Sequence, residues 1–229
     1  PFLAKEIKNN DLSEEFLTKK DDYNFVQVDS SNIKSAIKQI TDLSLEKGLD
    51  ERSVQVLAPM YKGEAGIDAL NSTLQEIYNP PERHKDEVIY GEYIYREKDK
   101  VLQLVNDLDN NVFNGDIGFI ESINGNKIII NFDGNRVEYD KKDLKQIKHA
   151  YAISIHKSQG SEFTHVLMPI SKSYYKMLYN KLIYTGVSRA KKSLTLVGDA
   201  AAFQRAVGNN YSSGRKTSLK EQITMVYNS

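Results

Sequence analysis

The spacing of hydrophobic positions predicts an alternation of strands and helices over the first eighty residues. Apolar residues recur at helical intervals in Ile33–Leu43 and in Ile67–Ile77. Gly48 follows the first segment and Asn79-Pro80-Pro81 follows the second, and these residue types end helices. Strands that alternate with amphipathic helices indicate a mainly parallel sheet. The predicted strands are 24–29 and 53–59.

The pattern changes between about Glu82 and Lys148. Short apolar runs follow one another there without an amphipathic helix, and Asn-Gly or Asp-Gly pairs separate them. Such pairs favour tight hairpin turns. The predicted strands are 101–105, 117–121, 127–132 and 136–139. We therefore predict a small antiparallel barrel, residues 86–148, inserted into an α/β domain that comprises residues 1–85 and 149–229.

The α/β pattern returns after the predicted barrel. Ser218 and Glu221 have the spacing of a capping box for a last helix. Before them, the pattern predicts strands at 151–155, 164–170 and 193–198, with a helix at 175–187. The predicted fold class is thus α/β with an inserted all-β unit.

Composition narrows the class of protein. Hydrophobic residues make up 40% and charged residues 27% of the 229 positions, which is ordinary for a globular chain. No apolar stretch approaches the roughly 20 residues of a membrane span, and the first residues lack the features of a signal peptide. The absence of cysteine excludes a disulfide scaffold, a thiolate zinc site and a cysteine nucleophile. We expect a cytoplasmic protein with no membrane partner.

The net charge of zero conceals an uneven distribution of charge. Residues 1–110 contain 14 Lys and Arg against 22 Asp and Glu, whereas residues 111–229 contain 17 against 9. A basic half suits a partner rich in phosphate. A solvated, lysine-rich face is the alternative explanation.

The most informative polar stretch follows a predicted strand and runs from Ser154 to Phe163 as SIHKSQGSEF. The hydroxyls of two serines and the ammonium of Lys157 can contact phosphate oxygens, and Gly160 allows a backbone amide to approach a ligand closely. At the carboxyl end of a strand such groups project into the crevice where open α/β sheets bind ligands. An ordinary polar turn between a strand and a helix is the alternative.

A second stretch ends an apolar helical segment with basic residues. It runs from Leu182 to Lys192 and contains Arg189, with no acidic partner nearby in the sequence. Cations are favoured at helix C-termini, so a surface cluster is the alternative to a functional role.

The two stretches together closely resemble motifs V and VI of superfamily 1 helicases, in the RecD-like branch. The family pattern runs approximately TIHKSQGSEF and then YTAITRAK, where this chain has SIHKSQGSEF and YTGVSRAK. Ser154 and Ser188 keep the hydroxyl of the family threonines, and Gly186 replaces an alanine. The stretch at 56–63 resembles motif IV, with Lys62 where relatives often have arginine.

The resemblance extends to the predicted barrel, since residues 99–116 are similar to the opening of the SH3-like barrel that this branch inserts in its second motor domain. It therefore implies a RecA-like motor domain with an SH3-like insertion. The implied protein is an ATP-dependent helicase that moves 5′ to 3′ along single-stranded DNA in recombination and repair.

The phosphate loop G-x-x-x-x-G-K-[ST] does not occur in the chain. The nearest stretch, Gly208–Thr217, has its glycines one residue too far apart, and Arg215 separates Gly214 from Lys216. The resemblance therefore implies a C-terminal portion that is inactive as an ATPase alone. ATP with Mg²⁺ would be bound mainly by its own N-terminal motor domain. Single-stranded DNA and the subunits of a nuclease complex are the other expected partners.

The resemblance gives each candidate residue a role. Arg189 corresponds to the arginine finger of motif VI, which contacts the γ-phosphate. The nucleotide-binding candidates are Gly160, Ser161, Glu162, Arg189 and Lys62. The DNA-binding candidates are Ser154, His156, Lys157, Ser158 and Asn106. No metal site is expected, because the four histidines lack the spacing of metal ligands.

Other functions remain open from the residues alone. A nucleic-acid-binding module without motor activity would have the same barrel and basic half. An RNA helicase or the helicase part of a conjugative relaxase would have the same motifs. Contacts to phosphate do not distinguish DNA from RNA.

Overall fold

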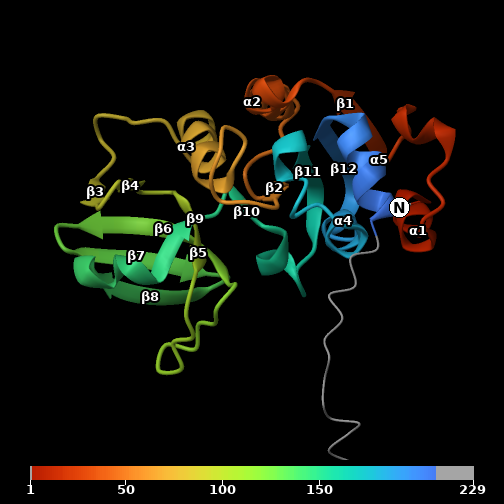
Figure 1. Cartoon of the computed structure of the whole chain (residues 1–229). Helices are drawn as coiled ribbons and strands as arrows, with labels where there is room; N and C mark the ends of the chain where they lie inside the picture. The colour runs from red at the N-terminus through yellow and green to blue at the C-terminus, as the bar shows by residue number, and fades with distance from the viewer. Residues whose placement is uncertain (1, 210–229) are drawn as a thin grey trace, which may run out of the picture.

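The computed structural model describes residues 2–209, without the side chain of Phe2, and the predicted capping box at Ser218 and Glu221 lies outside these residues. Figure 1 shows a helix-covered sheet beside a smaller all-β unit. The helix-covered sheet has five strands in the order β1-β12-β11-β2-β10, and all of its strand pairings are parallel. Its strands are β1 (Tyr23–Gln27), β2 (Val54–Ala58), β10 (Ala152–Ser154), β11 (Phe163–Ile170) and β12 (Ala190–Gly198).

Helices cover both faces of this sheet. Two of them pack together on one face, and the other three pack together on the opposite face (Figure 1). The first group is α2 (Ile33–Glu46) and α3 (Ile67–Tyr78), and the second is α1 (Phe2–Asn9), α4 (Asn180–Val187) and α5 (Ala200–Gly208). Five short 3-10 helices complete the described chain: η1 (Glu14–Leu17), η2 (Ser30–Asn32), η3 (Lys141–Gln146), η4 (Ile155–Ser158) and η5 (Lys172–Tyr174).

The predicted helix at 175–187 is wrong in its first turn. Ser171 accepts a hydrogen bond from the Ser173 amide and caps the short η5 instead, and Tyr179 has an extended backbone, with φ −140° and ψ 159°. Helix α4 therefore begins only at Asn180. Apolar residues before Asn180, among them Tyr174 and Leu178, are also buried. The helical spacing of apolar positions therefore continues on the N-terminal side of the true start of the helix.

The smaller unit consists of antiparallel strands. Its main sheet has the order β8-β7-β6-β5-β9, and a separate hairpin pairs β3 with β4. The strands are β3 (Glu87–Tyr90), β4 (Tyr93–Arg96), β5 (Lys100–Gln103), β6 (Ile117–Asn124), β7 (Lys127–Phe132), β8 (Asn135–Asp140) and β9 (Ile147–His149). The Asn-Gly and Asp-Gly pairs make the two hairpin turns of β6–β8, where Gly125 and Gly134 have φ of +62° and +92°. We call this unit, residues 87–149, the barrel.

Each unit has its own hydrophobic core. One core lies between the parallel sheet and its helices, and the other is enclosed by the barrel strands. Strands β5 and β9 pair with each other, Val101 opposite His149, so the start of the main barrel sheet lies beside the point where the chain leaves the barrel. From β9 the chain passes directly into β10, the edge strand of the parallel sheet. Among residues 2–209 no helix has the length and apolar character needed to cross a membrane.

Candidate functional site

Strand β10 positions the first half of the SIHKSQGSEF stretch. The strand ends at Ser154, whose hydroxyl accepts a hydrogen bond from the Lys157 amide at 3.2 Å and so caps η4. Ser158 is fully buried, and its hydroxyl donates to the Ile155 carbonyl at 2.7 Å. His156 is exposed. Of these candidates, His156 and Lys157 therefore offer polar atoms at the surface, whereas the two serine hydroxyls hold the turn together.

The second half of the stretch turns back toward the start of β11. Gly160 has φ +86°, a conformation that an L side chain rarely adopts, and the Ser161 amide donates to the Ser158 carbonyl at 3.1 Å. Glu162 then lies directly before Phe163, the first residue of β11. The short crossover thus returns the chain from the carboxyl end of β10 to the amino end of β11.

Arg189 lies between α4 and β12, and two backbone carbonyls and one hydroxyl hold its guanidinium. The Nε donates to the Thr185 carbonyl at 3.2 Å, Nη1 donates to the Ser161 carbonyl at 3.1 Å, and Nη2 donates to the Ser188 hydroxyl at 3.0 Å. These contacts join the two motif-bearing stretches through one side chain. The carbonyl of Arg189 also accepts from the Phe163 amide at 2.9 Å, which fixes the two segments side by side.

The guanidinium of Arg189 has no carboxylate partner among residues 2–209. No ion pair within the described part of the chain includes it. Glu162, which follows the Ser161 carbonyl that Arg189 contacts, instead pairs with Lys191 at 3.2 Å, and both of these side chains are 58% exposed. Arg189 is only partly buried, so its charge is available to an anionic ligand.

The two motif-bearing stretches meet near the edge of the sheet where β11 and β12 begin. The polar stretch begins at the carboxyl end of β10, as its sequence predicts, because Ser154 ends that strand. The short crossover, with the 3-10 turn η4 and no full helix, then takes Glu162 to the amino end of β11. Arg189 lies beside it at the amino end of β12, where Phe163 pairs with Ala190.

Lys62 lies in the loop that follows the carboxyl end of β2. The loop is tight, because a Cβ on Gly66 would lie 2.4 Å from the Tyr61 carbonyl oxygen and 2.6 Å from the backbone of Lys62. Lys62 is exposed, and the structure does not bring it into contact with Arg189. Its predicted role at the nucleotide stays a prediction.

The barrel meets the motif V turn across a groove. The ammonium of Lys157 donates to the side-chain oxygen of Asn114, and the Asn114 amide donates to Asn106 Oδ1 at 2.9 Å. An open hollow of about 340 Å³ lies here. Its lining residues are Asn114, Gly115, Asp116, His156, Lys157, Gln159 and Ser161. We call this hollow the motif V groove.

Two DNA-binding candidates far apart in sequence, Asn106 and Lys157, thus belong to one hydrogen-bonded chain through Asn114. Asn114 belongs to an Asn-Gly pair, which predicts mainly a turn, and neither Gln159 nor Asp116 is among the DNA-binding candidates from the sequence. No local signal indicates that a barrel loop lies opposite this particular turn.

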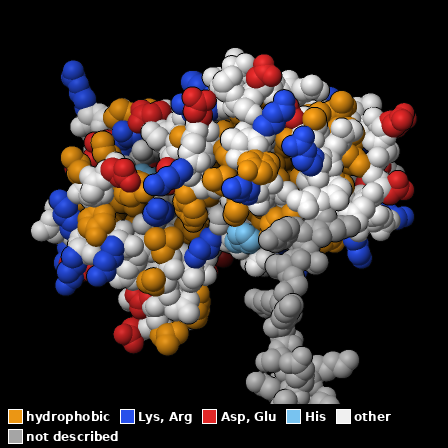
Figure 2. All heavy atoms as spheres, viewed as in Figure 1, with side chains coloured by type: hydrophobic (Ala, Val, Ile, Leu, Met, Phe, Trp, Pro, Cys, Tyr) orange, Lys and Arg blue, Asp and Glu red, His pale blue; other side chains and the backbone are white. Residues whose placement is uncertain are grey.

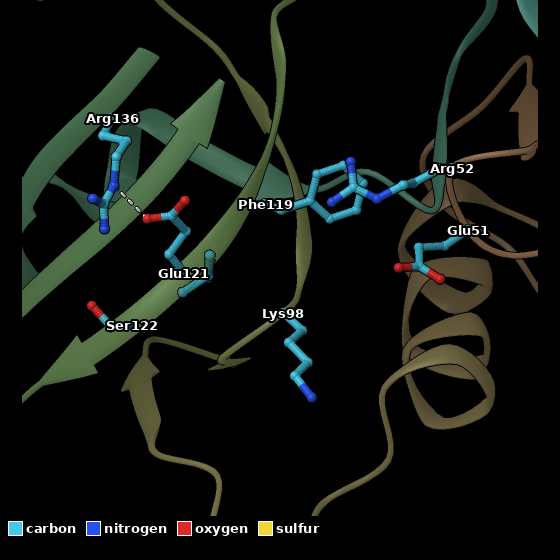
Figure 3. Close-up of a pocket in the computed structure, with 8 residues that line it drawn as sticks. Glu51, Arg52, Lys98, Phe119, Glu121, Ser122 and Arg136 are labelled. Carbon is cyan, nitrogen blue, oxygen red and sulfur yellow. Dashed lines mark hydrogen bonds and ion pairs between the residues drawn. The ribbon is translucent and has the colours of Figure 1, made fainter. Parts of the chain in front are cut away.

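A second hollow lies on the barrel boundary. Figure 3 shows the guanidinium of Arg52 stacked on the ring of Phe119, with 4.0 Å from Cζ to the ring centroid. The hollow has a volume of about 530 Å³. Glu51 and Glu121 contribute carboxylates to its wall, and Glu121 pairs with Arg136 at 2.6 Å. This mixed charge does not favour an anionic ligand.

Basic side chains gather on one visible face of the molecule. In Figure 2, Lys and Arg side chains cluster over the barrel and along its boundary with the helix-covered sheet, whereas acidic ones are scattered toward the margins. Within residues 2–209 there is no group of three or more His, Asp or Glu side chains that could hold a metal ion.

Two family models match the chain. The model of the ATP-dependent RecD-like DNA helicase SH3 domain matches residues 70–132, and the model of the UvrD-like helicase C-terminal domain matches residues 149–197. The second range contains both motif-bearing stretches, and the first contains the groove-lining loop of the barrel.

Curated relatives are similar over most of this chain. The ATP-dependent RecD2 DNA helicase of Deinococcus radiodurans is 37% identical over 171 residues, which is 75% of this chain and 23% of the relative. The RecBCD enzyme subunit RecD of Buchnera aphidicola subsp. Acyrthosiphon pisum is 32% identical over 163 residues, which is 69% of this chain and 27% of the relative. The chain thus spans about a quarter of the length of these relatives.

A solved structure of Pif1 helicases at forked double-stranded DNA has the same fold. It is 15% identical, covers 99% of this chain and 51% of its own, and superposes with a TM-score of 0.54. The similarity supports a RecA-like α/β fold with a parallel sheet. The curated relatives, with the two family models, show that the chain belongs to the RecD-like helicases of superfamily 1.

Proposed function

We propose that this chain is the second motor domain of an ATP-dependent DNA helicase that moves 5′ to 3′ along single-stranded DNA. In this proposal residues 1–85 and 149–229 form the motor domain and residues 86–148 form its SH3-like insertion. A role in recombination and repair, alone or within a nuclease complex, follows from the relatives and is part of the proposal.

The observation that carries the proposal is the environment of the Arg189 guanidinium. Its guanidinium is oriented by three neutral acceptors and has no carboxylate partner within residues 2–209. A planar, permanently charged fork held in this way is suited to a phosphoryl group that gains negative charge in the transition state. The carbonyl of Ser161 orients it, so motif V and motif VI would respond together to a bound nucleotide.

The motif V groove supports the second part of the proposal. His156 and Lys157 offer cationic or hydrogen-bonding atoms from the motor domain, and Asn106 and Asn114 offer amides from the barrel. Contacts of this kind go mainly to phosphates and fix a strand in register without reading its sequence. The nucleotide and DNA sites would then be connected by the short segment from Lys157 to Ser161.

The chain supplies only part of a nucleotide site. It contains no phosphate loop, so the β- and γ-phosphates and Mg²⁺ of ATP would be held by a first motor domain. Gly160, Ser161, Glu162 and Lys62 would complete the site from this side. We therefore expect the 229-residue chain alone to show no steady-state ATPase activity with single-stranded DNA.

The proposal is tested by replacing Arg189 in the full-length protein that contains this chain. Arg189→Ala should lower DNA-stimulated ATPase activity by roughly 10³-fold or more, the contribution of an arginine finger. Arg189→Lys should fail almost as badly, because an ammonium does not reproduce the bidentate fork. Affinity for single-stranded DNA without nucleotide, measured by fluorescence anisotropy, should stay near that of the wild type.

Arg205→Ala is the matched control, because it removes an exposed guanidinium from α5, outside both motif-bearing stretches of the sequence. It should leave the ATPase rate unchanged. Near-normal activity in a folded Arg189→Ala protein would show that Arg189 is only a helix-end cation and would reject the proposal. Normal ATPase activity with no single-stranded DNA stimulation would favour a different nucleic acid.

A further inference from the structure

The boundary between the barrel and the parallel sheet buries a polar network around one carboxylate. Asp99 lies in the turn between β4 and β5 and is 0% exposed. Its Oδ2 accepts from Gln75 Nε2 and from the Arg96 amide, each at 2.7 Å. Its Oδ1 accepts from Asn79 Nδ2 at 2.7 Å and from the Tyr151 hydroxyl at 2.9 Å. Four donors thus converge on a single buried side chain.

The partners of Asp99 come from both units of the molecule. Gln75 belongs to α3, Asn79 is the C-cap residue directly after this helix, and Tyr151 precedes β10 in the parallel sheet. Arg96 belongs to the barrel hairpin, and His149, the last residue of β9, has its Nε2 3.1 Å from Asp99 Oδ2. The carboxylate therefore joins the barrel to the α/β unit rather than stabilising either one alone.

Helix α3 and its C-cap carry the side-chain amides. Asn71 and Gln75 are four residues apart and lie one above the other on the helix, and Asn79 follows its last residue as the C-cap. Asn71 donates to the Ala152 carbonyl and accepts from the Ala152 amide, both at 2.8 Å. The helix with its C-cap thus holds the barrel through Gln75 and Asn79, and it holds β10, the strand that leads into motif V, through Asn71.

A second set of contacts ties the barrel to the turn before β2. The ammonium of Lys100 in β5 donates to the Glu51 carbonyl at 2.6 Å and to Gln55 Oε1 at 2.9 Å. The stack of Arg52 on Phe119 spans the same boundary (Figure 3). Rotation of the barrel against the parallel sheet would break these contacts together with the hydrogen bonds of Asp99.

The network around Asp99 is complete. Within residues 2–209 the buried side-chain atoms that lack a hydrogen-bond partner belong to Tyr23, Tyr78 and Gln103, and none of them is part of it. A fully satisfied buried network rigidifies its surroundings, and losing one member leaves the others desolvated and unpaired. The barrel has therefore one strongly favoured orientation against the sheet.

We propose that Asp99 is a positioning residue that fixes the angle between the barrel and the parallel sheet and thereby sets the width of the motif V groove. The contact between Asn114 and Lys157 across the groove depends on that angle. The statement that the groove holds single-stranded DNA rests on the proposed function, whereas the angle itself can be measured without any ligand.

The geometric test uses two spin labels on the 229-residue chain. The sequence has no cysteine, so Ser35→Cys on α2 and Asn126→Cys on the barrel, both exposed, can be labelled specifically. Pulsed electron–electron double resonance on this doubly labelled parent chain should give one narrow distribution of the distance between the two labels. Asp99→Asn should broaden it, because the new amide group faces hydrogen-bond donors. A distribution as narrow as that of the parent would overturn the proposal.

A matched pair of tyrosine variants keeps the test valid if Asp99→Asn does not fold. Tyr151→Phe removes a buried hydroxyl that donates to Asp99. Tyr139→Phe removes a buried hydroxyl that donates to Gln103 within the barrel, at 3.0 Å. Each variant removes one buried hydroxyl, but only Tyr151→Phe removes it from the Asp99 network. Only Tyr151→Phe should therefore broaden the distance distribution. Equal broadening in both would indicate general loosening and would count against a special role of the Asp99 network.

Affinity for single-stranded DNA provides the functional readout. If the competent orientation falls to about a third or a tenth of the population, the apparent dissociation constant rises about three- to tenfold. Asp99→Asn should show this rise in fluorescence anisotropy, and Tyr139→Phe should not. Broadened distances with unchanged affinity would overturn the link between the angle and the groove. Absence of DNA binding by the parent chain would count against the proposed function alone.

Discussion

At the residue scale, side chains that look equivalent in the sequence have different roles in the structure. Ser154, His156, Lys157 and Ser158 are all DNA-binding candidates by their motif, yet the hydroxyls of Ser154 and Ser158 are engaged by backbone groups of their own turn. Motif membership predicts which segment forms the site. Which atoms of the segment face outward depends on the 3-10 geometry of η4, and periodicity alone does not encode it.

Lys157 is the cation of the motif V groove, and its replacement should weaken DNA binding in a defined way. If about three phosphates are neutralised, log K for single-stranded DNA should fall against log salt with a slope near −2. Lys157→Ala should reduce the magnitude of the slope by somewhat less than one, the value for a single phosphate contact on single-stranded DNA.

Fluorescence anisotropy of the chain across a salt series measures this change. Lys34→Ala, on the exposed side of α2, is the control and should leave the slope unaltered. An unchanged slope for Lys157→Ala would show that this ammonium contacts no phosphate.

At the element scale, the spacing of apolar residues predicts several helices and strands but leaves out three short strands. The predictions of helices near 33–43 and 67–77 are confirmed by α2 and α3, and the strand 127–132 is confirmed by β7. The β3–β4 hairpin and the three-residue β9 were missed. They are too short for a periodic pattern, and their pairing partners, rather than their own residues, define them.

The link between β5 and β2 has a consequence for the dependence of stability on pH. Burial of Lys100 lowers the pKa of its ammonium to about 8 from its ordinary value of 10.5. Between these two values the unfolded chain binds one proton more than the folded chain, so the free energy of unfolding should rise with pH. The expected gain from pH 8 to pH 9.5 is about 1–2 kcal/mol.

This gain should appear as the difference between the wild type and Lys100→Met in urea unfolding at several pH values. The chosen range stays below pH 10, because the pKa of the buried tyrosines, Tyr151 among them, is raised by burial, and their contribution to stability is lost only above their ordinary pKa. Parallel pH profiles of the two proteins would show that Lys100 does not titrate in this window.

At the scale of the whole molecule, the sequence indicated an α/β fold with an all-β insertion but not how the two parts meet. Apart from Arg96, three residues away, the partners of Asp99 are 20 to 52 residues distant in sequence, which is too far to produce a local signal. The same is true of Lys157 and Asn114, which lie 43 residues apart. Contacts between units are set by tertiary packing, so they require a structure.

The pairing of β5 with β9 also determines the order in which the chain can fold. Before the barrel exists, pairing Val56 with Ala152 must close a very long loop, and a formed barrel brings the ends of its own segment together and shortens that loop. Barrel contacts connect neighbouring hairpins, whereas β1 must find β12 at the opposite end of the described chain. Local contacts form sooner than contacts between distant parts of the chain.

In pulse-labelling hydrogen exchange during refolding, amides of β6 and β7 should therefore gain protection before those of β1 and β12. Simultaneous protection would contradict this order. The insertion would then serve as the nucleus on which the surrounding sheet is assembled.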